Sequence, residues 1–238
     1  VRCRGPRELQ EAVFADRAFA LIPCPLAPTG TGMPTDGGYV LTGRWQWATG
    51  VQHGDWVMVN SMVERDGEAP EGRFCLLRMD EVEVIDTWHT SGMRGTGSHD
   101  VVVDGVFVPD AQTIAAADLR GDHPPGALLC DDPFVAFPFT PVLTVVAAAP
   151  ALGGAEAAVD HYREYIKDRV LPYSPGDRQV EQQASQIRLA EALATVHAAR
   201  LVWEHAIEQV TATYRSGGSI SRNERGRLRL ATAYTVRQ

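Results

Sequence analysis

Residues 86–109 read DTWHTSGMRGTGSHDVVVDGVFVP, a glycine-rich loop that runs directly into a β-branched segment ending at proline. Residues 101–108 have the composition of two strands, and Asp104-Gly105 is a turn sequence between them. Three glycines in the loop relieve the steric bar on a positive φ, namely Gly92, Gly95 and Gly97. The stretch therefore predicts a loop of small residues at the edge of a β domain, directly before a strand.

Further strand-like segments lie upstream of this loop, separated by the turn sequences Asp36-Gly37-Gly38 and Asp66-Gly67. The predicted strands are Tyr39–Thr42, Arg44–Ala48, Trp56–Met62, Arg73–Arg78, Glu81–Asp86, Val101–Val103 and Val106–Val108. Short strands at this spacing predict a compact antiparallel sandwich or barrel, which we assign to residues 19–115.

Helical sequences flank the predicted β domain. Residues 1–18, with helical composition from Leu9 to Ala18, are interpreted as the tail of an N-terminal helical domain. Residues 116–141 are rich in Pro and Gly and predict an irregular linker. Residues 142–238 predict a C-terminal helical bundle, with helices at about 142–169, 178–214 and 221 to the end.

The predicted bundle helices carry local signals of their own. Ser216 to Ser219 form a turn sequence, and Ser221 with Glu224 three positions later is a capping box. The second helix has two apolar stripes, which predict that it is buried on both faces. The stripes are Ile187, Ala190, Ala194, His197 and Leu201, and Leu189, Leu193, Val196, Trp203 and Ile207.

Composition excludes several classes of function. The 238 residues carry a formal net charge of -8, which argues against a nucleic-acid partner. The four cysteines lie far apart, so neither a zinc site nor a disulfide framework is signalled, and we predict no metal site. We find no apolar run approaching the ~18 residues that span a bilayer, and no signal peptide. A cytoplasmic protein that binds no membrane is expected.

An aromatic segment, Trp45-Gln46-Trp47-Ala48-Thr49-Gly50, is the first candidate site. Alternate residues of a strand share a face, so both indoles and the Thr49 hydroxyl are predicted on one side. That group would suit a planar ligand with hydrogen-bonding atoms. The alternative is a pair of tryptophans packed in the core of the β domain.

Two familiar site patterns are rejected for residues 92–100. The glycines follow Gly-x-x-Gly-x-Gly and lead into a strand, so this is no dinucleotide fingerprint. Ser98-His99-Asp100 is not a hydrolytic triad, because consecutive strand residues point to opposite faces. We expect these three residues to serve packing.

The motifs resemble the acyl-CoA dehydrogenase superfamily and, within it, the flavin-dependent monooxygenase branch. Residues 45–50 are similar to that branch's Trp-x-Phe-x-Ser-Gly, with Thr49 at the serine position. Residues 25–30, Pro-Leu-Ala-Pro-Thr-Gly, are similar to the Ser-Leu-Ala-Pro-Thr-Gly of aromatic-ring hydroxylases. Residues 169–173 and 183–190 resemble an Arg-x-x-Phe-Gly segment and a Gln-Ala-x-Gln-x-x-Leu-Ala helix, so the likeness covers residues 19–238.

This resemblance implies an α+β fold with a β-barrel or sandwich middle domain before a helical bundle. It implies an enzyme that uses reduced flavin, FAD or FMN, and O2 to hydroxylate a small, aromatic substrate. It also implies a separate flavin reductase as the partner protein and assembly of this protein into a homotetramer. Thr49 is the implied catalytic residue, and the implied flavin contacts are Trp45, Trp47, Thr49, Thr29, Trp88, Arg94, Ser98, Arg169 and Gln183.

Two alternatives stay open. The first is an acyl-CoA dehydrogenase that passes a hydride to FAD, although that group's Thr-Glu-Pro and Trp-Ile-Thr patterns are missing. The second is a catalytically silent assembly fragment. The chain opens with Val1 and stops at Gln238 inside a predicted helix, so we expect it to be incomplete. The resemblance places the acid-base histidine of the monooxygenases beyond Gln238.

Overall fold

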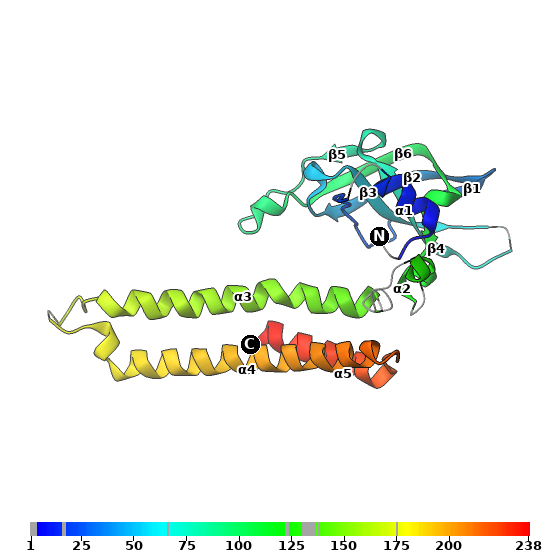
Figure 1. The fold of residues 1–238 in the computed structure, drawn as a ribbon. Helices are drawn as coiled ribbons and strands as arrows, with labels where there is room; N and C mark the ends of the chain where they lie inside the picture. Colours follow the sequence, from blue (N-terminus) through cyan, green and yellow to red (C-terminus); the bar gives the residue numbers. More distant parts are fainter. Residues whose placement is uncertain are drawn as a thin grey trace. The chain divides into compact units, whose positions relative to one another are not determined.

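The computed structural model describes residues 4–15, 18–65, 67–121, 124–129, 137, 139–174 and 176–238. The chain divides into two compact units, Val1–Ala136 and Phe137–Gln238, the first built on a sheet and the second on long helices (Figure 1). The predicted linker, 116–141, includes the point of division. Residues 122–123, 130–136 and 138 of that linker lie outside the described residues.

Seven strands of the described residues form one sheet, in the order β5-β6-β2-β1-β3-β4-β7. The pairs are antiparallel except β1 with β3, which run parallel with Gly30 opposite Ser61. The predicted α+β class is confirmed, with this one parallel pair added to the expected antiparallel pattern. The strands are β1 Gly30–Thr35, β2 Gly38–Ala48, β3 Trp56–Val63, β4 Glu71–Arg78, β5 Glu83–Ile85, β6 His99–Pro109 and β7 Thr113–Ala115.

The long antiparallel pair β2 and β6 corrects the prediction of two short strands broken at Asp104-Gly105. β6 is continuous, and the register slips by one residue where Thr42 faces Asp104 and Leu41 faces Val106. Gly105 has φ +66°. A bulge of this kind inserts one residue without ending the strand, and β2 is long enough to pair on both sides of it. The predicted turn at Asp36-Gly37 does join β1 to β2.

Short helices flank the sheet. α1, Arg7–Phe14, buries Leu9 and Val13, and it ends before the predicted limit at Ala18. Residues 16–17 lie outside the described residues, as does Asp66 of the second predicted turn. α2, Ala116–Arg120, follows β7 directly. The apolar core of the sheet is one cluster that includes Leu41, Trp45, Ala48, Val51, Val57, Val59, Leu77 and Val101.

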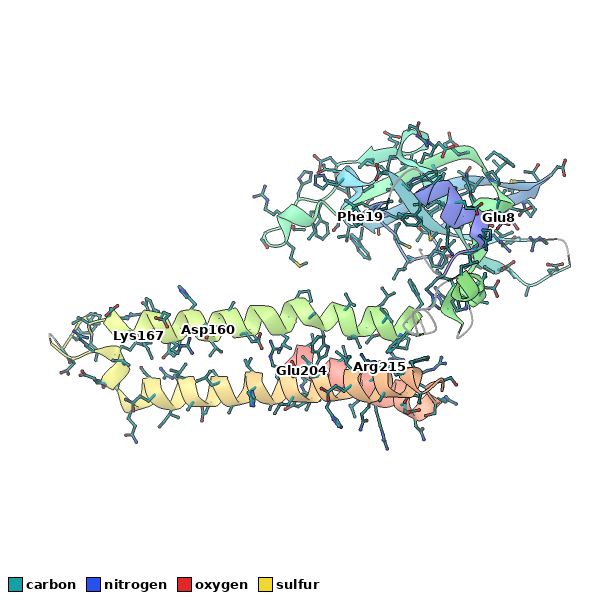
Figure 2. The ribbon with its side chains drawn as sticks, viewed as in Figure 1. Glu8, Phe19, Asp160, Lys167, Glu204 and Arg215 are labelled. Carbon is teal, nitrogen blue, oxygen red and sulfur yellow. The ribbon has the colours of Figure 1, made fainter. Side chains whose placement is uncertain are left out.

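The second unit contains the three predicted helices: α3 Phe139–Asp168, α4 Gln183–Arg215 and α5 Arg222–Arg237. The capping box is present, since the Ser221 hydroxyl accepts from the Glu224 amide and the Glu224 carboxylate accepts from the Ser221 amide. Arg200 of α4 forms a bidentate ion pair with Glu156 of α3 at 2.5 and 2.6 Å. The labelled Glu204, also on α4, accepts from the same guanidinium (Figure 2).

The prediction that α4 is buried on both faces is wrong for this chain by itself. Ile187, Leu193 and Leu201 are 48, 42 and 52% exposed. Helices α3 and α5 both pack against α4 (Figure 1), but two helices cover only part of its circumference. An open hollow of about 600 Å³ between α4 and α5 adds to this apolar surface.

α3 also corrects the statement that no apolar run approaches the length of a membrane span. By length and composition alone it is long and apolar enough to cross a bilayer, with a mean hydropathy of 1.7 in its most apolar 18-residue window. Alanine, glycine, threonine and proline dilute the stretch, which hides it from a search for continuous large apolar residues. A bundle helix of a soluble protein has the same composition, so this feature alone assigns no membrane role.

Candidate functional site

The candidate site lies where β2 ends and the loop before β6 folds back on it. Thr49 and Gly50 form a turn after β2, and the Gly50 amide donates to the Thr96 carbonyl at 2.8 Å. The Thr49 and Ser98 hydroxyl oxygens are 3.0 Å apart, and those of Ser98 and Thr96 are 2.8 Å apart. The structure thus brings together two predicted site residues, Thr49 and Ser98, through a row of three hydroxyls.

Trp45 and Trp47 do not share a face, contrary to the prediction. Trp45 is fully buried in the sheet core, and its Nε1 donates to the Asn60 carbonyl at 2.6 Å. Trp47 is 67% exposed, and its φ is +63°. The pairing of β2 with β6 is irregular between Trp45 and Ala48, so the alternation of faces breaks at this point. The alternative of a core tryptophan therefore holds for Trp45 alone.

The environment of Trp45 depends on two glycines. Gly30 of β1 and Gly43 of β2 lie against its six-membered ring, and a Cβ at either position would collide with that ring or with neighbouring backbone. These glycines form a slot for the indole between adjacent strands. Sequence reasoning missed the slot, although Gly43 two residues before a tryptophan was a visible signal.

The loop from Thr87 to Gly97 closes around one carbonyl. The Met93 oxygen accepts from Trp88 Nε1 at 3.0 Å, from the Thr96 hydroxyl at 3.0 Å and from the Thr96 amide at 3.1 Å. Met93 has φ +54° and Gly97 has φ +49°, whereas Gly92 and Gly95 do not take positive φ. Of the three glycines singled out in the sequence, Gly97 adopts the positive φ that glycine allows, and Met93 holds the other left-handed position of the loop.

Trp88 and Arg94, both predicted flavin contacts, lie on this loop. Trp88 is half-buried and its indole is tied to the loop by the bond to Met93. Arg94 begins a short 3-10 turn and is exposed, as is Met93. The loop therefore presents an aromatic ring, a thioether and a guanidinium close in sequence to the hydroxyl row.

Ser98, His99 and Asp100 are buried anchors for the loop, and each has different partners. His99 Nδ1 accepts from the amides of Thr87 and Trp88 at 3.2 and 3.3 Å, and its Nε2 lies 3.0 Å from the Gln52 amide nitrogen. Asp100 accepts from Arg44 at 2.6 Å and from the Thr87 hydroxyl. Among these three described residues no hydrogen bond joins one to another, which agrees with the rejection of a hydrolytic triad, and their polar partners anchor the loop.

Thr29 closes the segment of residues 25–29 before β1. It is exposed, and its hydroxyl donates to the Arg44 carbonyl at 2.7 Å. Asn60 Nδ2 holds the same segment by donating to the Leu26 carbonyl. Burial raises the pKa of the neighbouring Cys24 thiol to about 12, which keeps it neutral. Hydrogen bonds therefore attach this segment to β2 and β3 at two points, Thr29 and Leu26.

Arg169 and Gln183, the predicted contacts of the helical unit, lie at the two ends of the connection between α3 and α4. Arg169 donates to the Tyr165 hydroxyl, and its guanidinium carbon lies 4.9 Å from the centre of the Tyr165 ring. The Arg169 carbonyl accepts from the Gln179 amide at 2.8 Å. Gln183 is the first residue of α4, and both predicted side chains are exposed.

The residues of the sheet unit fit a flat heteroaromatic ligand. Trp47 offers an exposed ring and Thr49 an exposed hydroxyl, and both lie within three residues of chain at the end of β2. Trp47 and Met93 hold left-handed backbone conformations that cost non-glycine residues of order 1 kcal/mol. Such strain often marks a binding or catalytic site, and here it places the Trp47 indole outside the core.

Comparison with known proteins gives the family. The family described as acyl-CoA dehydrogenase, C-terminal domain, matches residues 145–238. A pigment production hydroxylase of Rhodococcus sp. (strain ATCC 21145) is 34% identical over 227 residues, covering 95% of this chain and 58% of the relative. The flavin-dependent monooxygenase oxygenase subunit HsaA of Mycobacterium tuberculosis is 31% identical over 206 residues, covering 86% of this chain and 51% of the relative.

A solved structure, that of XiaF from Streptomyces sp. in complex with FADH2 and glycerol, has a TM-score of 0.89 and 27% identity, covering 99% of this chain and 60% of that one. A weaker sequence match is the oxygenase component of an FADH(2)-dependent resorcinol hydroxylase of Rhizobium sp., at 29% identity, 82% of this chain and 49% of the relative. The chain spans about half the length of the curated relatives it matches.

Residues 145–238 match the acyl-CoA dehydrogenase C-terminal domain, and the chain as a whole has the fold of acyl-CoA dehydrogenase-like hydroxylases. The relatives that the chain resembles are flavin-dependent monooxygenases and their oxygenase components. The resemblance stated from the motifs is therefore confirmed.

Proposed function

We propose that this chain belongs to the oxygenase component of a flavin-dependent monooxygenase that hydroxylates a small aromatic substrate. One observation carries the proposal: an exposed hydroxyl, Thr49, follows the exposed Trp47 ring by two residues at the end of β2, in a chain whose relatives are oxygenase components. The relatives include an enzyme named for resorcinol, an aromatic ring compound, which supports the substrate class.

Each site residue of the sheet unit has a proposed task. Trp47 and Trp88 cover the flavin rings, Thr49 bonds a ring atom of the flavin, and Ser98 supports Thr49 through its 3.0 Å contact. Thr29 and Arg94 border the site. Trp45 is removed from the set of flavin contacts, because it is sealed in the core and acts by holding β2 in place.

Arg169 and Gln183 are proposed to contact a flavin from the helical unit. A guanidinium fork suits the phosphate oxygens of a flavin nucleotide. The resemblance places this contact across a subunit interface, which needs a homo-oligomer such as the predicted tetramer. The exposed apolar residues of α4 are compatible with such assembly.

When bound, reduced flavin supplies the electrons and the oxygen-activating ring, and the protein supplies binding, orientation and exclusion of water. Because the chain's relatives are oxygenase components, a separate flavin reductase is the proposed partner. We propose FAD or FMN as the flavin and the cytoplasm as the location.

Anaerobic binding of reduced flavin tests the proposal. The purified protein is titrated with reduced FAD and reduced FMN, then mixed with O2 while the flavin absorbance is followed. Saturable binding, followed by oxidation slower than that of free flavin, supports the oxygenase. Anaerobic bleaching of oxidised flavin by an acyl-CoA identifies a dehydrogenase instead, and absence of binding by every flavin form leaves the assembly fragment.

A further inference from the structure

The three hydroxyls next to the candidate site form a row that ends on a backbone carbonyl. Thr49 contacts Ser98, Ser98 contacts Thr96, and Thr96 contacts the Met93 carbonyl oxygen, with separations of 3.0, 2.8 and 3.0 Å. Ser98 is buried, Thr96 is half-buried and Thr49 is exposed. The row therefore runs from the loop interior to the open end of the site.

The direction of each hydrogen bond follows by elimination. A carbonyl oxygen only accepts, so the Thr96 hydroxyl uses its single hydrogen on Met93. Thr96 must then accept from Ser98, and Ser98, having used its hydrogen, must accept from Thr49. The Thr49 hydrogen points into the protein, which leaves the lone pairs of its oxygen for a ligand.

We propose that Thr96 and Ser98 are positioning residues that make Thr49 a hydrogen-bond acceptor toward the ligand, and so make the site selective for reduced flavin. This inference rests on the proposed function. Reduced flavin carries an N–H on its central ring where oxidised flavin has a bare nitrogen that only accepts. An accepting Thr49 complements the reduced form, and it excludes a flavin carbonyl as its partner, because two acceptors repel each other.

The binding of the two flavin forms separates this role from a structural one. Loss of loop structure weakens both forms alike, whereas reversal of the Thr49 hydroxyl changes their ratio. In Thr96→Val the Ser98 hydroxyl loses its acceptor and is free to donate to Thr49, so the Thr49 hydrogen can turn toward the ligand. We expect the preference for reduced over oxidised flavin to fall about five- to tenfold, the effect of one neutral hydrogen bond.

The experiment measures dissociation constants of reduced and oxidised FAD and FMN anaerobically, by ultrafiltration, for the unsubstituted protein and four variants. The variants Thr96→Val and Ser98→Ala should both show a reduced preference for reduced over oxidised flavin. Thr96→Ser should keep this preference, because the hydroxyl remains. Thr90→Val is the matched control, since the Thr90 hydroxyl bonds the Gly92 carbonyl on the same loop but lies outside the row.

An unchanged ratio in Thr96→Val and Ser98→Ala, with reduced flavin still bound, overturns the inference and leaves the proposed function standing. An equal fall in Thr90→Val also overturns it, because the effect would then belong to the loop as a whole. If Thr96→Val does not fold, Ser98→Ala decides by the same ratio. Failure of the unsubstituted protein to bind either flavin overturns the proposed function itself.

Discussion

Substitution of Gly30 by alanine is the sharpest test of the core beside the site. A Cβ at Gly30 would lie 2.5 Å from Cη2 of the Trp45 ring and closer still to Cζ2. The ring would have to withdraw by roughly 1.5–2 Å to regain ordinary contact. Its Nε1 bond to the Asn60 carbonyl, 2.6 Å long and buried, would stretch or break.

The cost can be worked out from these two effects. Overpacking a tight core costs about 1–3 kcal/mol, and a lost hydrogen bond adds about 1 kcal/mol. We expect Gly30→Ala to lower the free energy of unfolding by about 2–4 kcal/mol, which corresponds to a fall in Tm of roughly 5–15 °C for a domain of this size. Urea unfolding followed by tryptophan fluorescence measures the change.

Gly95→Ala is the matched control, because a Cβ there meets no heavy atom within 4 Å and Gly95 does not have a positive φ. It should change the free energy of unfolding by less than about 0.5 kcal/mol. A double-mutant cycle adds Trp45→Phe, whose smaller ring leaves room for the new methyl, so the double variant should be less destabilised than the sum of the two single variants. A Gly30→Ala variant as stable as the unsubstituted protein would refute the claim that the Trp45 indole needs a glycine at position 30.

Trp47→Gly should stabilise the protein by about 1 kcal/mol, because glycine removes the strain of φ +63°, while flavin affinity falls; thermal unfolding and flavin titration measure the two effects. Glu156→Gln should make the free energy of unfolding of the helical unit depend less on pH under acidic conditions. Arg200 lowers the pKa of Glu156, so the pair stabilises the fold above about pH 4.5 and loses its effect as pH falls through the depressed pKa; urea unfolding at pH 3 to 7 measures it. Cys24 and Cys75, whose thiol pKa values burial raises to about 12, should resist iodoacetamide at pH 8.5 until the protein is unfolded, as peptide mass spectrometry can show.

Each of these expectations has a clear opposite. Trp47→Gly would contradict the proposed role of this indole if flavin affinity were unchanged. If the free energy of unfolding fell with decreasing pH as steeply in Glu156→Gln as in the unsubstituted protein, the ion pair would not contribute to pH-dependent stability. Rapid alkylation of Cys75 in the native protein would show that β4 opens readily.

Regular elements could be predicted from the sequence because their signals are local. The three long helices follow from composition and turn residues, and the capping box at Ser221 was visible as two residues three positions apart. Most strands were also found, since β-branched runs between Gly-rich turns have few alternatives.

The sequence could not show where side chains stop alternating between the two faces of a strand. The irregularity between Trp45 and Ala48 separates two indoles that the pattern places together, and the bulge at Gly105 continues a strand that the pattern divides. Both depend on how a neighbouring strand pairs, which is not encoded within the segment itself. The hydroxyl row is hidden for the same reason, because Thr49 lies far from Thr96 and Ser98 along the chain.

The closure of the loop around the Met93 carbonyl has a consequence for how such proteins diversify. Residues 89–95 are largely exposed and hang between fixed attachment points at Thr87 on one side and Ser98 to Asp100 on the other. We expect substitution of their exposed side chains to leave the sheet undisturbed. Side-chain substitutions at the exposed positions of this loop should therefore reshape the rim of the site at little cost to folding, as long as the backbone conformation around the Met93 carbonyl is kept.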